Sequence, residues 1–493
     1  MKLKYLLSII AIAALTVSCA DFLNLSDPDK ITTGNYYQTE EDIQASVFGV
    51  YAQISSGYFY GTGAPYFQED KARILFYPDT GVNAGENASF DNCSVMASNQ
   101  FVLSRWNAIY NCIDRANVVL KHLDDATYSS ESVKKGFEGE ARFVRALCYY
   151  NLVSDFGEVP LVLQKLESLA EVNAANVRQP KADVYQAIFD DCKWVIDNSG
   201  LPDLQGASGC GRASKVAAMA LWAKALLQKA TDEDFASEKV TLSKEAVTLL
   251  SNALGKAKFS DFTTVDLTEI WDVAKQPTAQ EAIFQLNFLG GSSSNYSSYN
   301  GLFRAKVIDD PSKEVNKNKA GGSFHMQERK TLAIYDEPED LRFTQLMALG
   351  SDGVIPEYYT LKYRDTQEYA SCNCIILRYA DVVAMLAEAN FHAGNASEAV
   401  KYVNMLRKRA GLGNTTATSG TALRDVIYKE RQREFVYEFM VWSDMKRGFS
   451  KAEVMQKMKA DGADMYGAED WLLPIPATQS LLNPEGLYQN PGY

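Results

Sequence analysis

Histidine is scarce in this chain of 493 residues, which has only His122, His325 and His392, far apart in the sequence. Zinc sites need closely spaced ligands, as in HExxH or CxxC, and neither motif occurs. Cys372 and Cys374 are separated by a single residue, but no second pair accompanies them. The sequence therefore predicts no zinc site and no cofactor.

Calcium needs only oxygen ligands, which an irregular segment can supply from carboxylates and backbone carbonyls. The stretch from Asp79 to Asn92 is rich in Asp and Asn, but it contains no EF-hand pattern. We leave a structural calcium open and predict no metal site.

Signatures of catalysis are also missing. The chain has no GxSxG elbow, no glycine-rich phosphate loop and no nucleophile with a recognisable base. A glycosidase needs two positioned carboxylates, and the 62 acidic residues single out no pair. We predict that the chain is not an enzyme, although counting residues leaves a surface glycoside hydrolase open.

Long apolar runs are absent beyond the first nineteen residues, so no later segment is expected to span a bilayer. The formal net charge is -13, which argues against nucleic acid as a partner and against electrostatic docking on anionic lipid. Any contact with a membrane is expected to be made by a lipid anchor alone.

The N-terminus, MKLKYLLSIIAIAALTVSC, has the layout of a bacterial lipoprotein signal. Lys2 and Lys4 form a basic region, Leu6 to Val17 form a short apolar run, and Cys19 follows a small residue. We predict that residues 1–18 are removed and that Cys19 is lipidated, with plain secretion as the alternative. Several acyl chains on one cysteine would hold the protein on the membrane.

Seven cysteines remain after Cys19, an odd number without the dense spacing of a disulfide scaffold. We predict that most are buried thiols. They are Cys93, Cys112, Cys148, Cys192, Cys210, Cys372 and Cys374.

Helical periodicity dominates the rest of the chain and predicts a mainly α fold. We expect one body from residue 19 to 493, with an N-terminal part of about 19–260 and a C-terminal part of about 261–493. The predicted helices cover 40–54, 105–123, 132–156, 182–197, 214–228, 242–254, 377–393, 397–409 and 422–447.

Two long segments, 55–99 and 284–327, lack this periodicity and are rich in Gly, Asn and aromatic residues. Long loops on a rigid scaffold often carry binding sites, and this aromatic content favours order. The tail is rich in proline, so we expect it to be extended and packed through Trp471, Leu472, Leu473 and Ile475.

A repeat pattern lies near residue 394. Ala399, Val403 and Leu406 follow Gly394 at offsets of 5, 9 and 12 residues, as in tetratricopeptide repeats. Ala246, Leu250 and Ala253 repeat the second half of this pattern. Because any tight helical hairpin produces similar spacing, this pattern alone leaves true repeats undecided.

Six segments resemble one family and occur in its order: RWNAIYNCIDRANVVLKHL (105–123), GEARFVRALCYYNLVSDFGEVPLV (139–162), LRYADVVAMLAEANFHAG (377–394), VNMLRKRAGL (403–412), KERQREFVYEFMVWSDMKRG (429–448) and LLPIPATQSLLNPEGLYQNPGY (472–493). They closely resemble the SusD/RagB family. The resemblance implies a right-handed tetratricopeptide-like helical superhelix, a lipid anchor in the bacterial outer membrane and exposure at the cell surface. It also implies binding of glycan or peptide and a SusC-like TonB-dependent transporter as partner.

The matched motifs are expected to be structural. Glu430, Arg431, Arg433 and Glu434 lie within two helical turns and predict a charge network on the helix or to a neighbouring hairpin. Arg145, with nearby Glu140 and Arg142, is expected to tie helices together in the same way.

The resemblance places the ligand in the two irregular segments, which share no motif with the family, so no residue can be transferred. Aromatic faces stack on sugar rings while Asn bonds hydroxyls, which favours oligosaccharide. Neither segment contains Trp, so peptide remains the alternative, with a helical scaffold less favoured. The candidate ligand-binding residues are Tyr58, Tyr60, Tyr66, Phe67, Tyr77, Phe90, Asn92, Asn99, Tyr296, Tyr299 and Phe303.

Overall fold

The computed structural model describes residues 36–76, 84–291, 295–319, 322, 324–464 and 466–493. The predicted signal with Cys19, the candidate Tyr77 and residues 79–83 of the possible calcium segment lie outside these ranges. Among the residues described, no helix combines the length and apolarity needed to cross a bilayer.

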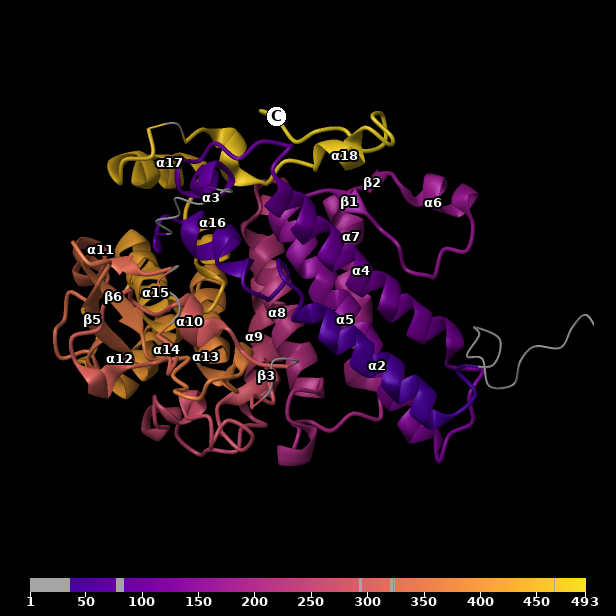
Figure 1. Cartoon of the computed structure of the whole chain (residues 1–493), viewed down its shortest axis with the longest axis horizontal. Helices are drawn as coiled ribbons and strands as arrows, with labels where there is room; N and C mark the ends of the chain where they lie inside the picture. Colours follow the sequence, from indigo (N-terminus) through magenta and orange to yellow (C-terminus); the bar gives the residue numbers. More distant parts are fainter. Residues whose placement is uncertain (1–35, 77–83, 292–294, 320–321, 323, 465) are drawn as a thin grey trace, which may run out of the picture.

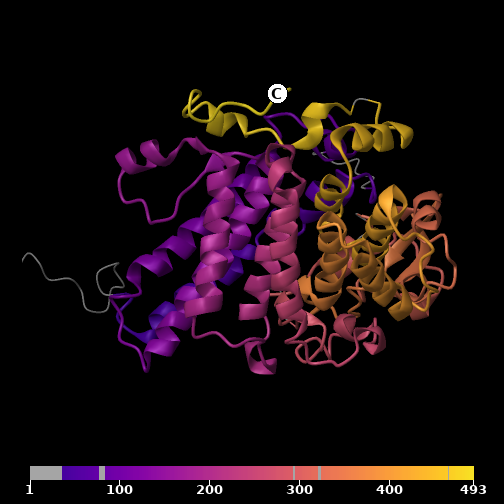
Figure 2. The ribbon, with the colours of Figure 1, turned by 180° about the vertical axis from the view of Figure 1, so that it is seen from behind.

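The body is a series of helices in which each packs on the next (Figure 1). Contacts run from α2 to α4, α5, α7, α8 and α9, then to α13, α14 and α15. Seen from behind, these helices stand side by side from the purple to the orange part of the chain (Figure 2). This arrangement confirms the predicted mainly α, helical-repeat fold. The bounds are α2 Glu40–Ile54, α4 Gln100–His122, α5 Glu131–Phe156, α7 Lys181–Asn198, α8 Lys215–Thr231, α9 Lys239–Leu254, α13 Tyr379–His392, α14 Ala396–Arg409 and α15 Gly420–Phe435.

Local signals fix several helix ends. Thr39 forms a capping box with Asp42 at the start of α2, and Asn99 accepts bonds from the first amides of α4. Gly157 ends α5 with a φ of 74°, a conformation that favours glycine. These residues stop and start the helices within a few positions of the predicted bounds.

The repeat pattern corresponds to a real hairpin. Gly394, with φ of 87°, turns the chain between α13 and α14. Ala399 and Val403 are fully buried against Ala387 of α13 and Leu423 of α15. Small and branched residues at these offsets therefore allow three helices to approach closely.

The single helix predicted over 422–447 is wrong. α15 ends at Phe435 and α16 (Val441–Gly448) begins six residues later, with Tyr437 and Phe439 at positive φ between them. Side chains distant in sequence hold this break: Lys362 donates to the Val436 carbonyl at 3.0 Å, and Glu69 accepts from the Phe439 amide at 2.6 Å. Tertiary hydrogen bonds thus replace the helical ones.

Short strands flank the helices. β3 (Ala282–Leu286) pairs antiparallel with β7 (Cys374–Arg378), so α13 begins after the predicted Leu377. β4 (Met326–Gln327), β6 (Pro356–Thr360) and β5 (Met347–Ser351) form a second sheet in that order, and β1 (Val159–Pro160) pairs with β2 (Arg178–Gln179). The remaining helices of at least four residues are η1 Tyr66–Asp70, α3 Ala84–Asp91, α6 Leu169–Ala175, η3 Glu233–Glu238, α10 Tyr299–Leu302, α11 Glu328–Ile334, α12 Leu341–Leu346, α16 Val441–Gly448, α17 Lys451–Ala460, η7 Ala468–Trp471 and α18 Ala477–Ser480.

The KERQREF charges form a buried network, which confirms the predicted role. Glu430, Arg431, Arg433 and Glu434 expose 4% of their surface or less. Arg431 reaches Asp381 of α13 at 2.9 Å, so α15 is bonded to the neighbouring hairpin. Because buried charges are costly unless paired, these contacts specify how the helices meet.

Arg145 and Arg142 of α5 both contact Asp191 of α7, at 2.8 and 3.0 Å, as expected for helix ties. Glu140 binds Arg212 at 2.6 Å. The seven cysteines are free thiols, and all except the half-buried Cys210 are buried. The prediction of mostly buried thiols is confirmed.

The tail crosses one end of the helices (Figure 1). Leu473 and Ile475 are buried, and the Leu473 amide donates to the Asp155 carbonyl at 2.7 Å. Further along, the Ala477 amide donates a hydrogen bond to the Ala97 carbonyl at 2.8 Å, so the tail joins the first irregular segment to the helical body.

Candidate functional site

The two irregular segments meet on one face. The Phe76 amide donates a hydrogen bond to the His325 carbonyl at 2.9 Å, and the Tyr299 hydroxyl donates one to the Tyr60 carbonyl. The rings of Tyr66 and Phe324 lie 4.8 Å apart. The expectation that both segments are ordered holds for their described residues.

Most of the predicted binding residues build the interior of this face. Tyr66, Phe67, Phe90, Asn99, Tyr299 and Phe303 are each at most 6% exposed. Their rings pack on one another, and Asn99 caps α4. Tyr58 and Tyr60 are half-buried, whereas Asn92 and Tyr296 are exposed. The buried candidates therefore support the structure of this region, and only the exposed ones can contact a ligand directly.

Tyr296, which is exposed, forms an aromatic pair with the half-buried Tyr369. Tyr296 is 43% exposed, and the two ring centres lie 5.4 Å apart with planes at 64°. Backbone bonds hold the two loops together: Gly291 donates to the Tyr369 carbonyl at 2.9 Å, and Ser297 donates to the Ala370 carbonyl at 2.8 Å. The two rings thus come from separate segments that are joined directly beneath them.

Tyr369 was not a sequence candidate, because it lies outside both irregular segments and belongs to no motif. Only the pairing of the two loops brings it beside Tyr296. An aromatic pair with hydroxyl tips can present apolar surface to a sugar ring and hydrogen bonds to its hydroxyls.

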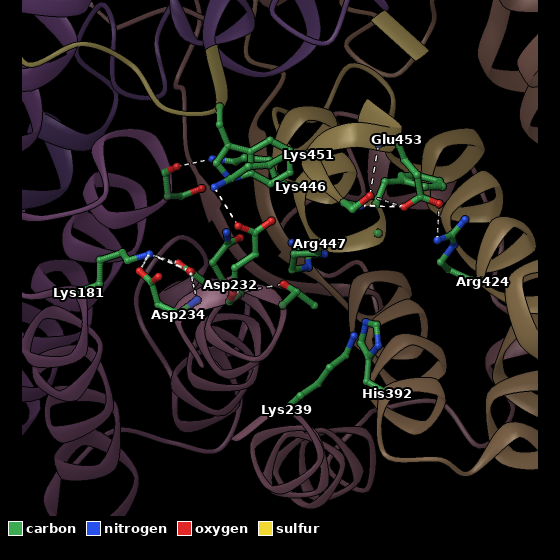
Figure 3. A pocket seen from close by; sticks show the side chains of 18 of the residues that line it. Lys181, Asp232, Asp234, Lys239, His392, Arg424, Lys446, Arg447, Lys451 and Glu453 are labelled. Atoms are coloured by element: carbon green, nitrogen blue, oxygen red, sulfur yellow. Dashed lines mark hydrogen bonds and ion pairs between the residues drawn. The ribbon is translucent and has the colours of Figure 1, made fainter. Parts of the chain in front are cut away.

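A separate cavity of about 620 Å³ lies where α7, α8 and α9 meet α13, α15, α16, α17 and the tail (Figure 3). Ion pairs surround it. Lys181 of α7 binds Asp232 at 2.6 Å and Asp234 at 2.5 Å. Across the cavity, Arg424 binds Glu453 at 2.8 Å.

The same cavity contains lysines with altered proton affinity. Burial lowers the pKa of Lys446 to about 8, and its amine donates to the Ser154 carbonyl. Burial also lowers the pKa of Lys239, whose side chain extends towards the His392 ring (Figure 3). His392 is buried beside Lys239 with its pKa lowered to about 4, so it is neutral at pH 7.

Sequence reasoning did not find this cavity. Its lining residues are spread from residue 153 to 472, in short stretches of which the longest runs from Lys446 to Lys451. Lys446 lies inside a segment with family resemblance, but its neighbours there gave no sign that it faces a cavity.

A second, more open groove of about 460 Å³ lies between residues 72–74, which follow η1, and α11, α15, α16 and α17. Arg73, Arg329 and Lys330 converge on Asp461 there, at 3.4, 3.0 and 2.6 Å. Within the described ranges, no group of three or more His, Cys, Asp or Glu side chains is arranged to hold a metal ion. The calcium hypothesis concerns partly undescribed residues and is not tested by this observation.

Two family models match separate parts of the chain. One, described as "SusD family", matches residues 352–493, and the other, described as "Starch-binding associating with outer membrane", matches residues 21–227. Together they cover well over half of the chain. A SusD-like protein P2 from Formosa agariphila is 25% identical, with 99% of this chain and all of that protein aligned.

The chain belongs to the SusD/RagB family. Solved structures of this family share its fold. A SusD-like protein from Bacteroides fragilis superposes with a TM-score of 0.75 at 20% identity, covering 95% of this chain and all of the other. Surface glycan-binding protein A from Bacteroides thetaiotaomicron, solved with laminarihexaose, has a TM-score of 0.74 at 18% identity, covering 92% and 100%. At these identities the likeness establishes the fold of this SusD/RagB protein.

Proposed function

We propose that this SusD/RagB protein is a surface-exposed outer-membrane lipoprotein that binds an oligosaccharide and delivers it to a TonB-dependent transporter. It acts as a binding lid and not as an enzyme. Family membership supports this role, and the N-terminal pattern ending at Cys19 supports a lipid anchor.

The observation that carries the proposal is the Tyr296–Tyr369 pair, in which Tyr296 is exposed and Tyr369 is half-buried. Sugar rings have apolar C–H faces that stack on aromatic side chains, and phenol hydroxyls can bond to the equatorial hydroxyls. The pair is held by the backbone hydrogen bonds from Gly291 to Tyr369 and from Ser297 to Ala370, which join the second irregular segment to the neighbouring loop. An aromatic surface of this size suits one or two sugar units.

Laminarihexaose is the first ligand to test, because a structural neighbour was solved with it. The purified chain is titrated calorimetrically with laminarihexaose, then with other plant, host and microbial oligosaccharides and with peptide pools. Tyr296→Ala and Tyr369→Ala are each expected to weaken the affinity for the bound oligosaccharide by about 2- to 13-fold, which corresponds to ~0.5–1.5 kcal/mol of aromatic contact.

Tyr488→Ala is the matched control, because Tyr488 is 47% exposed but lies on the tail. It is expected to leave the affinity unchanged. An equal loss of affinity in all three variants would show that the aromatic pair is not part of the binding site. Binding of peptides alone would favour the peptide-binding alternative. The bound oligosaccharide should be recovered intact, since hydrolysis would contradict a binding role.

The anchor and the partner need separate tests. Cys19→Ala is expected to release the protein from the outer-membrane fraction and to abolish incorporation of labelled fatty acid. The anchored protein is expected to co-purify with a TonB-dependent transporter. Retention of Cys19→Ala in the membrane would refute lipid anchoring at this residue.

A further inference from the structure

The cavity in Figure 3 has an unbalanced set of charges. Its carboxylates are all paired: Asp232 and Asp234 with Lys181, Glu453 with Arg424, and Glu233 with Lys451 at 3.1 Å. In contrast, Lys239 and Lys446 have no carboxylate partner within the described part of the chain. Among the residues that line this partly open cavity, six cationic side chains therefore stand against four carboxylates.

The wall of the cavity also has unused hydrogen-bonding capacity. Arg447 binds Glu388 at 2.8 Å and Asp444 at 2.7 Å, but its buried Nη1 has no partner among the residues described. The buried Oε1 of Gln228 is likewise unpartnered there. Buried polar atoms are normally hydrogen-bonded, so these two groups can serve a polar molecule in or beside the cavity with little rearrangement.

Apolar residues complete the lining. Phe391, Phe449, Trp471 and Leu472 face the same space as the lysines. This composition matches a ligand that has both a carboxylate and a ring. The ammonium groups can bind the carboxylate, and the ring can pack on the aromatic and aliphatic surface. A volume of about 620 Å³ lies in the range of small-molecule sites and accommodates one or two sugar rings.

We propose that this cavity is a second ligand site, which binds a sugar acid through Lys239 and Lys446. The neutral His392 beside Lys239 can donate or accept a hydrogen bond without adding charge. The site shares no lining residue with the Tyr296–Tyr369 pair and does not depend on the glycan-binding proposal.

The test is calorimetric titration of the purified chain with sodium glucuronate at pH 7 and low ionic strength, with glucose as the uncharged analogue. Glucuronate is expected to bind at least tenfold more tightly than glucose. Inorganic phosphate is titrated separately, and binding of phosphate with no response to glucuronate would overturn the sugar-acid assignment. Equal affinity for glucose and glucuronate would overturn the role of charge.

Lys239→Met removes one ammonium group and is expected to weaken glucuronate binding by tenfold or more. Lys239 is only half-buried, so the variant should fold, and Lys239→Arg should recover part of the affinity. Lys244→Met is the matched control, because Lys244 is exposed on the same helix and does not line the cavity. Unchanged binding by Lys239→Met, or an equal loss in the control, would refute the proposal.

Proton uptake tests the second lysine. Lys446 has its pKa near 8, with Asp155 of α5, Asp232 after α8, Lys181 of α7 and Lys71 after η1 also acting on it. A bound carboxylate favours the charged lysine, so titration at pH 8 in two buffers of different ionisation enthalpy should reveal proton uptake. No uptake would remove Lys446 from the site and overturn the two-lysine assignment.

Discussion

Replacing Arg378 by Met tests whether the buried charge network holds the C-terminal helices to the strands. Arg378 is 2% exposed and contacts three carboxylates: Glu281 at 2.6 Å, Glu434 at 2.8 Å and Glu438 at 2.8 Å. The methionine side chain fills most of the same volume without a charge. The variant therefore removes electrostatic partners more than packing.

The expected loss follows from what remains after the substitution. Glu281 keeps Arg409, and Glu438 keeps Lys362, so neither carboxylate is left alone. Nevertheless, the cluster keeps its three buried negative charges with one positive charge fewer. Breaking a buried pair by removing one partner typically costs about 3–5 kcal/mol, and we expect a loss of about 4 kcal/mol in the free energy of unfolding.

Urea denaturation at pH 7, followed by circular dichroism, measures this loss as a lower midpoint at an unchanged slope. Lys193→Met is the control, because its pair with Asp197 is exposed on α7 and should contribute no more than about 0.5 kcal/mol. The double variant Arg378→Met/Glu438→Gln should recover part of the stability, since it removes one excess negative charge. A loss below about 1 kcal/mol for Arg378→Met, or one equal to that of the control, would refute the reasoning.

Three further predictions concern stability. Burial raises the pKa of Glu69 to about 8, so the folded chain binds this proton more tightly than the unfolded chain and loses stability as the pH rises from about 4.5 to 8. Glu69→Gln should reduce this loss, measured as urea midpoints across that pH range. Parallel pH profiles for the variant and the unchanged chain would contradict the prediction. Burial alone would raise the pKa of Glu388, but Arg447 and Arg431 together outweigh it and lower this pKa to about 2. The stability that Glu388 contributes should therefore disappear as the pH falls from about 4.5 to 2, and Glu388→Gln should flatten the acid limb of the urea-midpoint profile. A Cβ at Gly200 would lie 2.0 Å from the Ser132 carbonyl oxygen, so Gly200→Ala should lower the thermal midpoint by an amount equivalent to about 1–3 kcal/mol. Gly206→Ala is the control, because open space surrounds Gly206 and the midpoint should not change. Equal midpoints for the two variants would show that the backbone at Gly200 moves without cost.

Much of the helical architecture could be predicted from local pattern. The bounds of α2 were predicted without error, and those of α7 and α14 within one residue, because apolar spacing and terminal residues act over a few positions. The break between α15 and α16 could not be predicted, since it depends on Lys362 and Glu69, which are remote in sequence.

The candidate site was predictable in region but not in detail. Aromatic content located the irregular segments, and the structure joins them through Phe76 and His325. Aromatic residues are equally suited to packing and to binding, so composition could not distinguish the buried Tyr299 from the exposed Tyr296.

By itself, the sequence determined the N-terminal lipoprotein pattern, the acidic balance and the succession of helical hairpins. These depend on composition and on residues a few positions apart. Only the tertiary structure decided which charges are paired, that Tyr369 stands beside Tyr296, and that Lys239 and Lys446 face one cavity. The physical reason is that pairing, exposure and desolvation depend on contacts between residues tens to hundreds of positions apart, and those contacts exist only when the helices pack.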